Sequence, residues 1–163
     1  MQSLDRDEVT VHVAASPAAV YAVVSDVTRT PELSPEIRSV RWLDGASGPV
    51  VGARFEAVNV AGPRGRSWRN RPVVTEAEPG RVFAFARSEP FAGTVEWSYR
   101  LTERDGGTDV TEAYEVTRPI TRVGWFVIER LYGGTDRRGD LRRGMEQTLD
   151  RLRTLVERGT VPS

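Results

Sequence analysis

Residues 139–158, GDLRRGMEQTLDRLRTLVER, decide the fold that this sequence predicts. Their apolar side chains recur at steps of three or four, which is the period of one helix face. The stripe consists of Leu141, Met145, Leu149, Leu152 and Val156, widened by Thr148 and Leu155. Asp140 is placed to cap this helix and Gly159 to end it. Because an isolated helix of this length is marginal in water, we expect its stripe to pack against a sheet.

The chain before this helix predicts strands and two short helices. Residues 9–13 alternate valine with polar residues, as in a half-buried strand. Ser16-Pro17 and Thr30-Pro31 then mark two helix starts. Six strand-like runs follow between turn signals, at residues 38–43, 53–60, 67–77, 82–87, 94–103 and 109–117. Short connections are typical of antiparallel hairpins. We therefore predict a single α+β domain over residues 1–163, with a curved seven-stranded antiparallel sheet wrapped around the long C-terminal helix.

Composition excludes several kinds of chemistry. Cysteine is absent, which excludes disulfides and thiolate catalysis. His12, the single histidine, falls on the polar side of its strand, so no histidine base is expected. No residues have metal-ligand spacing, and we expect neither a metal nor a cofactor. The formal charges balance, which gives no reason to expect nucleic-acid binding.

The N-terminal residues also bear on location. MQSLDRDEVT is polar and acidic, unlike a signal peptide, and no apolar run approaches the length of a membrane span. We therefore expect a cytoplasmic protein without membrane insertion. For its oligomeric state, we expect either a monomer or a homodimer.

One face of the predicted strands has the character of a ligand-binding wall. It combines aromatic side chains with a few polar ones, which is typical of small-molecule sites. The predicted ligand-binding residues are Phe55, Asn59, Trp68, Asn70, Phe83, Phe85, Trp97, Tyr99, Glu112 and Tyr114 from the strands, with Met145 and Leu149 from the helix. Ordinary core packing is the alternative reading for most of these residues.

Glu112 is in register with the apolar residues of its strand. A carboxylate on an inward face needs a partner, or burial raises its pKa. Either outcome suits a ligand-orienting group or a general acid. The alternative is a structural ion pair with an arginine. If the cavity catalyses a reaction, the proton-moving candidates are Glu112, Tyr99, Tyr114 and Asn59.

Three further features admit more than one interpretation. Glu36 follows the second short helix, where it could cap that helix or form an ion pair near the mouth of a cavity. A cluster of arginines could receive an anionic group or form a solvated strand edge; it consists of Arg64, Arg66, Arg69 and Arg71. The apolar residues 125–132 could be a lid, a dimer contact or core, and residues 133–135, Gly-Gly-Thr, a hinge before the long helix.

The element order and seven local strings resemble the START-like helix-grip superfamily (SRPBCC). Within it, they are similar to the polyketide cyclase/dehydrase-type proteins of bacteria. The strings are VHVAASPAAVY (residues 11–21), LSPE (33–36), VGARF (51–55), EPGRVFAF (78–85), WSYRL (97–101), GTDVTE (107–112) and MEQTLDRL (145–152). The resemblance implies an elongated hydrophobic cavity between sheet and C-terminal helix, and no universal catalytic motif.

We therefore predict that the protein binds a hydrophobic small molecule, such as a lipid, a polyketide or an aromatic compound, in that cavity. Two alternatives stay open. One is a polyketide cyclase or dehydratase that acts on a poly-keto chain in the same cavity. The other is a protein-interaction module that uses the apolar segment near Trp125 as its contact.

Overall fold

The computed structural model describes residues 3–61, 65–90, 92–132 and 136–159. Strands and helices follow in the order β1 (Arg6–Val13), α1 (Pro17–Val24), the 3-10 helix η1 (Val27–Arg29), α2 (Thr30–Leu33), β2 (Ile37–Trp42), β3 (Phe55–Ala61), β4 (Arg66–Asn70), β5 (Val73–Glu78), β6 (Val82–Glu89), β7 (Gly93–Arg104), β8 (Gly107–Arg118), α3 (Arg122–Tyr132) and α4 (Arg137–Gly159). None of the described helices has the length and apolar character that a membrane span needs.

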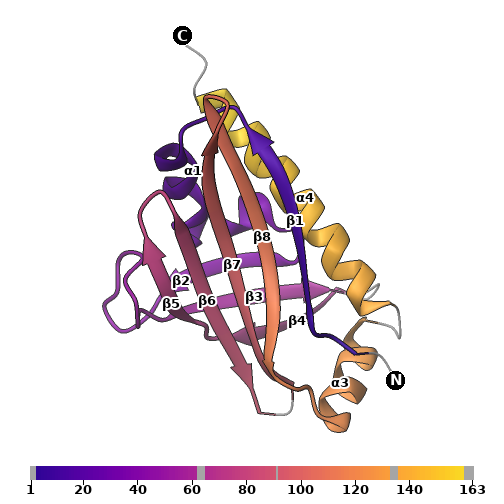
Figure 1. The fold of residues 1–163 in the computed structure, drawn as a ribbon. Coiled ribbons are helices and arrows are strands. Elements are labelled where there is room, and N and C mark those ends of the chain that lie inside the picture. The colour runs from indigo at the N-terminus through magenta and orange to yellow at the C-terminus, as the bar shows by residue number, and fades with distance from the viewer. Residues whose placement is uncertain (1–2, 62–64, 91, 133–135, 160–163) are drawn as a thin grey trace.

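The strands form two antiparallel sheets instead of the single seven-stranded sheet that we predicted. One sheet has the order β1-β8-β7-β6-β5 and the other β2-β3-β4. The prediction is wrong because the run at residues 67–77 divides at Pro72, which cannot donate to a ladder. The sheets meet where β5 passes the start of β3, and there the Val74 amide donates to the Ala53 carbonyl at 2.8 Å. The α+β architecture and the curved antiparallel sheet are confirmed (Figure 1).

Helix α4 packs along β1 and β8, with α1 and α2 also in contact with it (Figure 1). Its buried residues include the predicted apolar stripe from Leu141 to Val156. The Arg142 guanidinium donates to the Asp7 carboxylate at 2.8 Å, and the Ala14 amide donates to Glu157 at 3.0 Å. These contacts fix both halves of α4 against β1.

The ends of the helices depend on local capping. The two predicted short helices are present, and the Ser16 hydroxyl accepts a hydrogen bond from the Ala19 amide at 3.2 Å at the start of α1. Helix α4 begins earlier than predicted. Asp136, instead of Asp140, accepts from the Gly139 amide at 3.1 Å, and Asp140 lies in the first turn. Residues 133–135, the predicted hinge, lie outside the described residues.

The position of Gly93, at the start of β7, requires glycine because of both its backbone conformation and its surroundings. Its φ is +73°, and a Cβ there would clash with the Arg118 carbonyl oxygen. We expect Gly93→Ala to lower the free energy of unfolding by about 3 kcal/mol or more, because a left-handed conformation and a backbone clash add together. The measurement is urea unfolding.

Gly106→Ala is the matched control for this substitution. Gly106 has a similar φ of +75°, but no atom lies within 4 Å of the position of its Cβ. The Gly106→Ala substitution should lower the free energy of unfolding by only about 1 kcal/mol. If the two variants lose equal free energy of unfolding, the close approach of Gly93 to Arg118 adds nothing to the cost of the substitution.

Candidate functional site

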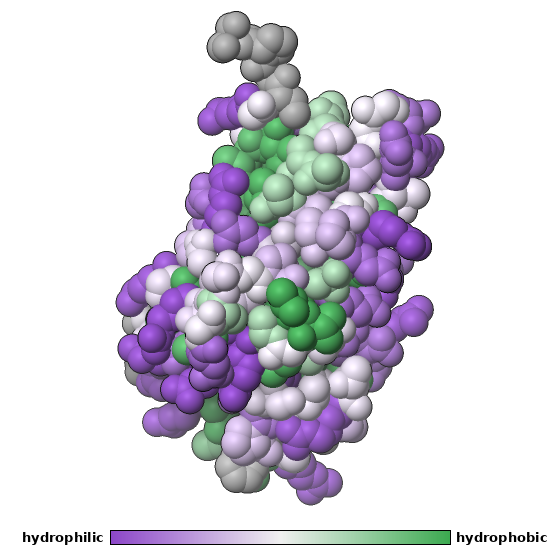
Figure 2. Space-filling model, turned by 90° about the vertical axis from the view of Figure 1, so that its left-hand side faces the viewer, coloured by the Kyte–Doolittle hydropathy of each residue, from purple (hydrophilic) through white to green (hydrophobic). Residues whose placement is uncertain are grey.

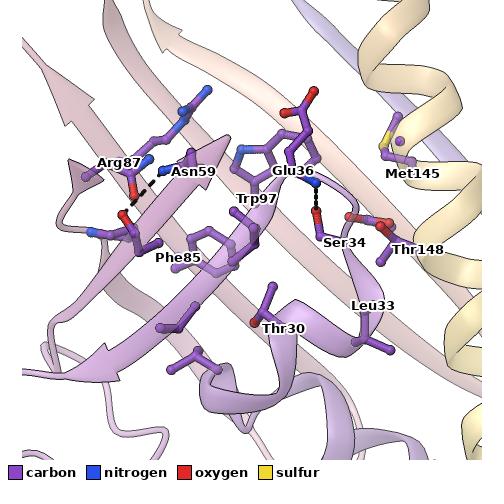
Figure 3. Close-up of a pocket in the computed structure, with 18 of the residues that line it drawn as sticks. Thr30, Leu33, Ser34, Glu36, Asn59, Phe85, Arg87, Trp97, Met145 and Thr148 are labelled. Atoms are coloured by element: carbon purple, nitrogen blue, oxygen red, sulfur yellow. Dashed lines mark hydrogen bonds between the residues drawn. The ribbon is translucent and has the colours of Figure 1, made fainter. Parts of the chain in front are cut away.

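A pocket of about 120 Å³ lies between the strands, helix α2 and helix α4; we call it the central pocket. Figure 3 shows Met145 and Thr148 of α4 on one side of it and Phe85 on the sheet side. Thr30 and Leu33 of α2 contribute a further wall. The pocket is therefore bounded by elements from the beginning, middle and end of the chain.

Most of the predicted ligand-binding residues meet in this pocket. Those that line it are Phe55, Asn59, Asn70, Phe83, Phe85, Trp97, Tyr99, Glu112 and Met145. Trp68 and Tyr114 instead line a second pocket, described below. Leu149 lies in the hydrophobic core and lines neither. Of the proton-moving candidates, Tyr99, Asn59 and Glu112 therefore share one pocket.

The wall is largely apolar, with two buried polar atoms that have no hydrogen-bond partner among the described residues: Glu112 Oε2 and Asn70 Oδ1. Asn59 is satisfied in part, because its side-chain amide donates to the Ala57 carbonyl at 3.4 Å (Figure 3). Buried polar atoms normally have partners, and leaving one unpaired costs about 1–3 kcal/mol. A ligand would therefore gain the most binding free energy by forming hydrogen bonds with these two unpaired atoms.

Glu112 and Tyr99 form a buried pair at the wall of the central pocket. Glu112 is 5 % exposed, and the Tyr99 hydroxyl donates to its Oε1 at 3.2 Å. Burial raises the pKa of the Glu112 carboxyl to about 8, and the hydrogen bond from Tyr99 offsets only part of that rise. Burial, and then the neighbouring carboxyl, also hold the pKa of Tyr99 well above its usual range. At neutral pH Glu112 is therefore mainly a neutral acid that can donate a proton or a hydrogen bond.

The rim of the central pocket carries an ion pair. Arg137, at the start of α4, is buried, and its guanidinium donates to both carboxylate oxygens of Glu36 at 3.1 and 3.4 Å. Glu36 follows α2, so the pair fastens α4 to the α2–β2 connection. The sequence placed Glu36 near the cavity mouth, but nothing in it pointed to Arg137 as the partner.

The arginines of the β4 region serve a different purpose from that of an open anion site. Arg41, Arg69 and Arg71 surround the buried Glu56 carboxylate at 3.1, 3.6 and 3.2 Å. Hydrogen bonds from Arg41 and then Arg71 lower the pKa of Glu56. These charges are paired across β2, β3, β4 and the β4–β5 connection, which agrees with the strand-edge reading. Arg64, part of the predicted cluster, lies outside the described residues.

A second pocket of about 280 Å³ lies under helix α3; we call it the α3 pocket. Gly124, Val127 and Ile128 of α3 line it on one side, and Trp97 and Tyr114 of β7 and β8 on another. Trp97, Arg87, Arg137 and Leu141 line both this pocket and the central one. The two pockets are therefore neighbours that share part of their walls.

Helix α3 is the apolar segment whose role the sequence left open. Trp125 is buried, so this side chain is not an exposed contact. Phe126, Val123 and Val127 are exposed by 64, 55 and 46 %. Only two other large apolar side chains among the described residues are so exposed: Val50 and Val51, in the β2–β3 loop. The face drawn in Figure 2, which carries α1 and that loop, has apolar areas in its middle and toward its upper end, among hydrophilic surroundings.

Sequence reasoning missed the pairing of Glu112 with Tyr99, although a signal for it was present. Asp105 and Gly106 form a two-residue turn in which both φ values are positive. Such a turn fixes the register of its hairpin, with Arg104 opposite Gly107 and therefore Tyr99 opposite Glu112.

Among the described residues, no three histidine, aspartate or glutamate side chains are grouped as a metal would require.

Comparisons with known proteins identify the family that the chain matches. The family model described as "Polyketide cyclase / dehydrase and lipid transport" matches residues 6–157. Among solved structures, the chain is similar to the Polyketide_cyc-like protein Cgl2372 from Corynebacterium glutamicum, at 31 % identity and a TM-score of 0.51, over 96 % of this chain and 91 % of that one. No curated protein matches the sequence.

Two further solved structures share the fold at low identity. The di-domain ARO/CYC StfQ of the steffimycin biosynthetic pathway has a TM-score of 0.73 at 18 % identity, over 96 % of this chain and 52 % of that one. CV1439 from Chromobacterium violaceum has a TM-score of 0.69 at 17 % identity, over 94 % of this chain and 99 % of that one. The resemblance to START-like polyketide cyclase/dehydrase-type proteins is confirmed. The family match extends over nearly the whole sequence, and the chain therefore belongs to the polyketide cyclase/dehydrase and lipid transport family.

Proposed function

We propose that the protein binds a hydrophobic small molecule with a ketone or hydroxyl group in the central pocket. The observation that carries this proposal is the unpaired oxygen of Glu112 in a largely apolar wall. An apolar body would replace water against the aromatic side chains, and the neutral Glu112 would donate to a ligand oxygen. Asn70 Oδ1 would accept from a ligand hydroxyl.

Two bicyclic probes of similar shape test this proposal. We expect 1-tetralone, which has a carbonyl, to bind about three- to tenfold more tightly than tetralin, which lacks it, because one hydrogen bond contributes about 0.5–1.5 kcal/mol. Glu112→Gln retains a donor and should keep this preference, whereas Glu112→Leu should bind the two probes equally. Isothermal titration gives the affinities.

The pH dependence sharpens the same test. The pKa of Glu112 is about 8, so the preference of the wild type for tetralone should disappear as the pH rises through that value. In Glu112→Gln it should persist. If neither probe binds, the proposal is wrong; if both bind equally to the wild type at neutral pH, Glu112 does not orient the ligand.

A polyketide cyclase or dehydratase is the second candidate, and the pairing of Tyr99 with Glu112 favours it. A neutral carboxyl with a pKa of about 8 can give its proton to a substrate oxygen near neutral pH, within an apolar pocket that holds the chain in place. For an enzyme, Glu112→Gln should reduce the turnover of a poly-keto thioester while leaving its binding intact. For a binding protein, the same variant should have no turnover to lose.

A further inference from the structure

The α3 pocket has no role in the function proposed above, although it is the larger of the two pockets. Its wall is mainly apolar and is closed on one side by Val127 and Ile128 of α3. Its sequence elements differ from those of the central pocket, because the β6–β7 turn and α3 contribute to the α3 pocket alone. It is therefore a second chamber beside the central pocket, with which it shares part of its wall.

Trp97 stands between the two chambers. Its indole lines both of them and packs against the Tyr114 ring with a centroid distance of 5.3 Å. Arg87 lines both pockets beside it, and Figure 3 shows Trp97 on the far wall of the central pocket, beyond Glu36. A side chain in this place limits how far a ligand in the central pocket can extend.

The polar groups of the α3 pocket define what it can hold. Tyr114 is 2 % exposed, and its hydroxyl has no partner among the described residues. Burial raises the pKa of Tyr114, so the hydroxyl remains a neutral donor. Glu89 lies at the β6–β7 end of the pocket, and burial raises its pKa as well. Arg69, Arg87 and Arg137 also line the pocket. Its mainly apolar wall suits an apolar tail, with an oxygen of that tail against the Tyr114 hydroxyl.

We propose that the α3 pocket is a second subsite that receives the apolar tail of the ligand, and that Trp97 is the partition that sets the tail length admitted. The ligand class is accordingly an aromatic or alicyclic ketone with a long apolar tail. This inference rests on the proposed function, because the ketone end must occupy the central pocket.

The isoleucines of the chain make the inference measurable. The chain has three: Ile37 lines the central pocket, and Ile120 and Ile128 line the α3 pocket. Labelling their δ1 methyl groups with ¹³C therefore gives a separate NMR signal for each chamber. The probes are the homologous alkyl phenyl ketones acetophenone, butyrophenone, octanophenone and dodecanophenone.

With the wild type, we expect all four ketones to shift the Ile37 signal, and only the longer ones to shift Ile120 and Ile128. Each methylene buried in the α3 pocket should tighten binding by about fourfold. Trp97→Leu should lower the length threshold, so that butyrophenone also shifts Ile120 and Ile128. Trp42→Leu, which changes a tryptophan that lines neither pocket, should leave the threshold unchanged.

The outcomes separate the two proposals. If Ile37 shifts but Ile120 and Ile128 respond to none of the ketones, the second subsite is refuted while the proposed function stands. If Ile37 does not shift with any ketone, the proposed function itself fails. If Trp97→Leu folds and leaves the threshold in place, Trp97 is not the partition.

Discussion

Glu112→Gln is expected to stabilise the protein at alkaline pH. The pKa of Glu112 is raised by burial to about 8, above its ordinary value of 4.5, so the folded state holds a proton that the unfolded state releases between these values. The wild type therefore loses stability as the pH rises from about 4.5 to 8, by roughly 1 kcal/mol per pH unit from this group. Glutamine keeps the shape of the neutral acid and cannot ionise. At about pH 9 the variant should be more stable than the wild type by on the order of 3 kcal/mol.

Urea unfolding of both proteins at about pH 5 and about pH 9 measures this difference. At the lower pH the two should differ by less than about 1 kcal/mol, because Glu112 is protonated in the folded state and the unfolded state releases its proton only above about pH 4.5. Glu115→Gln is the control, since Glu115 is an exposed carboxylate on the same strand and should change little at either pH. Parallel pH profiles for wild type and Glu112→Gln would mean that Glu112 ionises as an ordinary surface carboxylate does.

Glu36→Gln is expected to lower the free energy of unfolding by about 3 kcal/mol, because it removes the carboxylate against a buried guanidinium. The Arg137 side chain is 5 % exposed, and that of Glu36 30 %. Loss of the Glu36 carboxylate removes a strong attraction from this guanidinium, whereas the cost of its desolvation remains. Because this pair joins α4 to the α2–β2 connection, the loss should also loosen the rim of the central pocket.

The matched control for Glu36→Gln is Glu32→Gln. Glu32 pairs with Arg29 at 2.9 Å, but their side chains are 50 and 37 % exposed, and such solvent-accessible pairs contribute about 0–1 kcal/mol. The double variant Glu36→Leu/Arg137→Met should recover most of the lost stability, since an apolar pair has no desolvation cost. If Glu36→Gln and Glu32→Gln are equally mild in urea unfolding, the ion pair at the rim does not hold α4 in place.

The elements that could be predicted are those whose signal is local. The apolar stripe of α4 follows from a period along one helix, and the strand faces follow from alternation. The inward position of Glu112 followed in the same way, from its register with apolar neighbours on β8. Local periodicity determines which way a side chain faces, so these statements needed no tertiary information.

The remaining features depend on contacts between distant segments. Pro72 lies within the strand-like run at residues 67–77, but whether it bends a strand or ends it is decided by where β5 finds its partner. The α3 pocket requires α3 to fold against the end of the five-stranded sheet, and no spacing in the sequence predicts that contact. Glu36, which forms an ion pair with Arg137, lies 101 residues away from it in the sequence. Such pairings arise only after the chain has folded.

The two methionines of the chain provide the most direct test of the central claim, that a ligand occupies the space between the sheet and α4. They are Met1, at the N-terminus, and Met145, which lines the central pocket. In a protein with ¹³C-labelled methionine methyl groups, 1-tetralone should shift the Met145 signal in a saturable manner and leave the Met1 signal unchanged. A Met145 signal that stays fixed while tetralone binds elsewhere, or does not bind at all, would contradict the account.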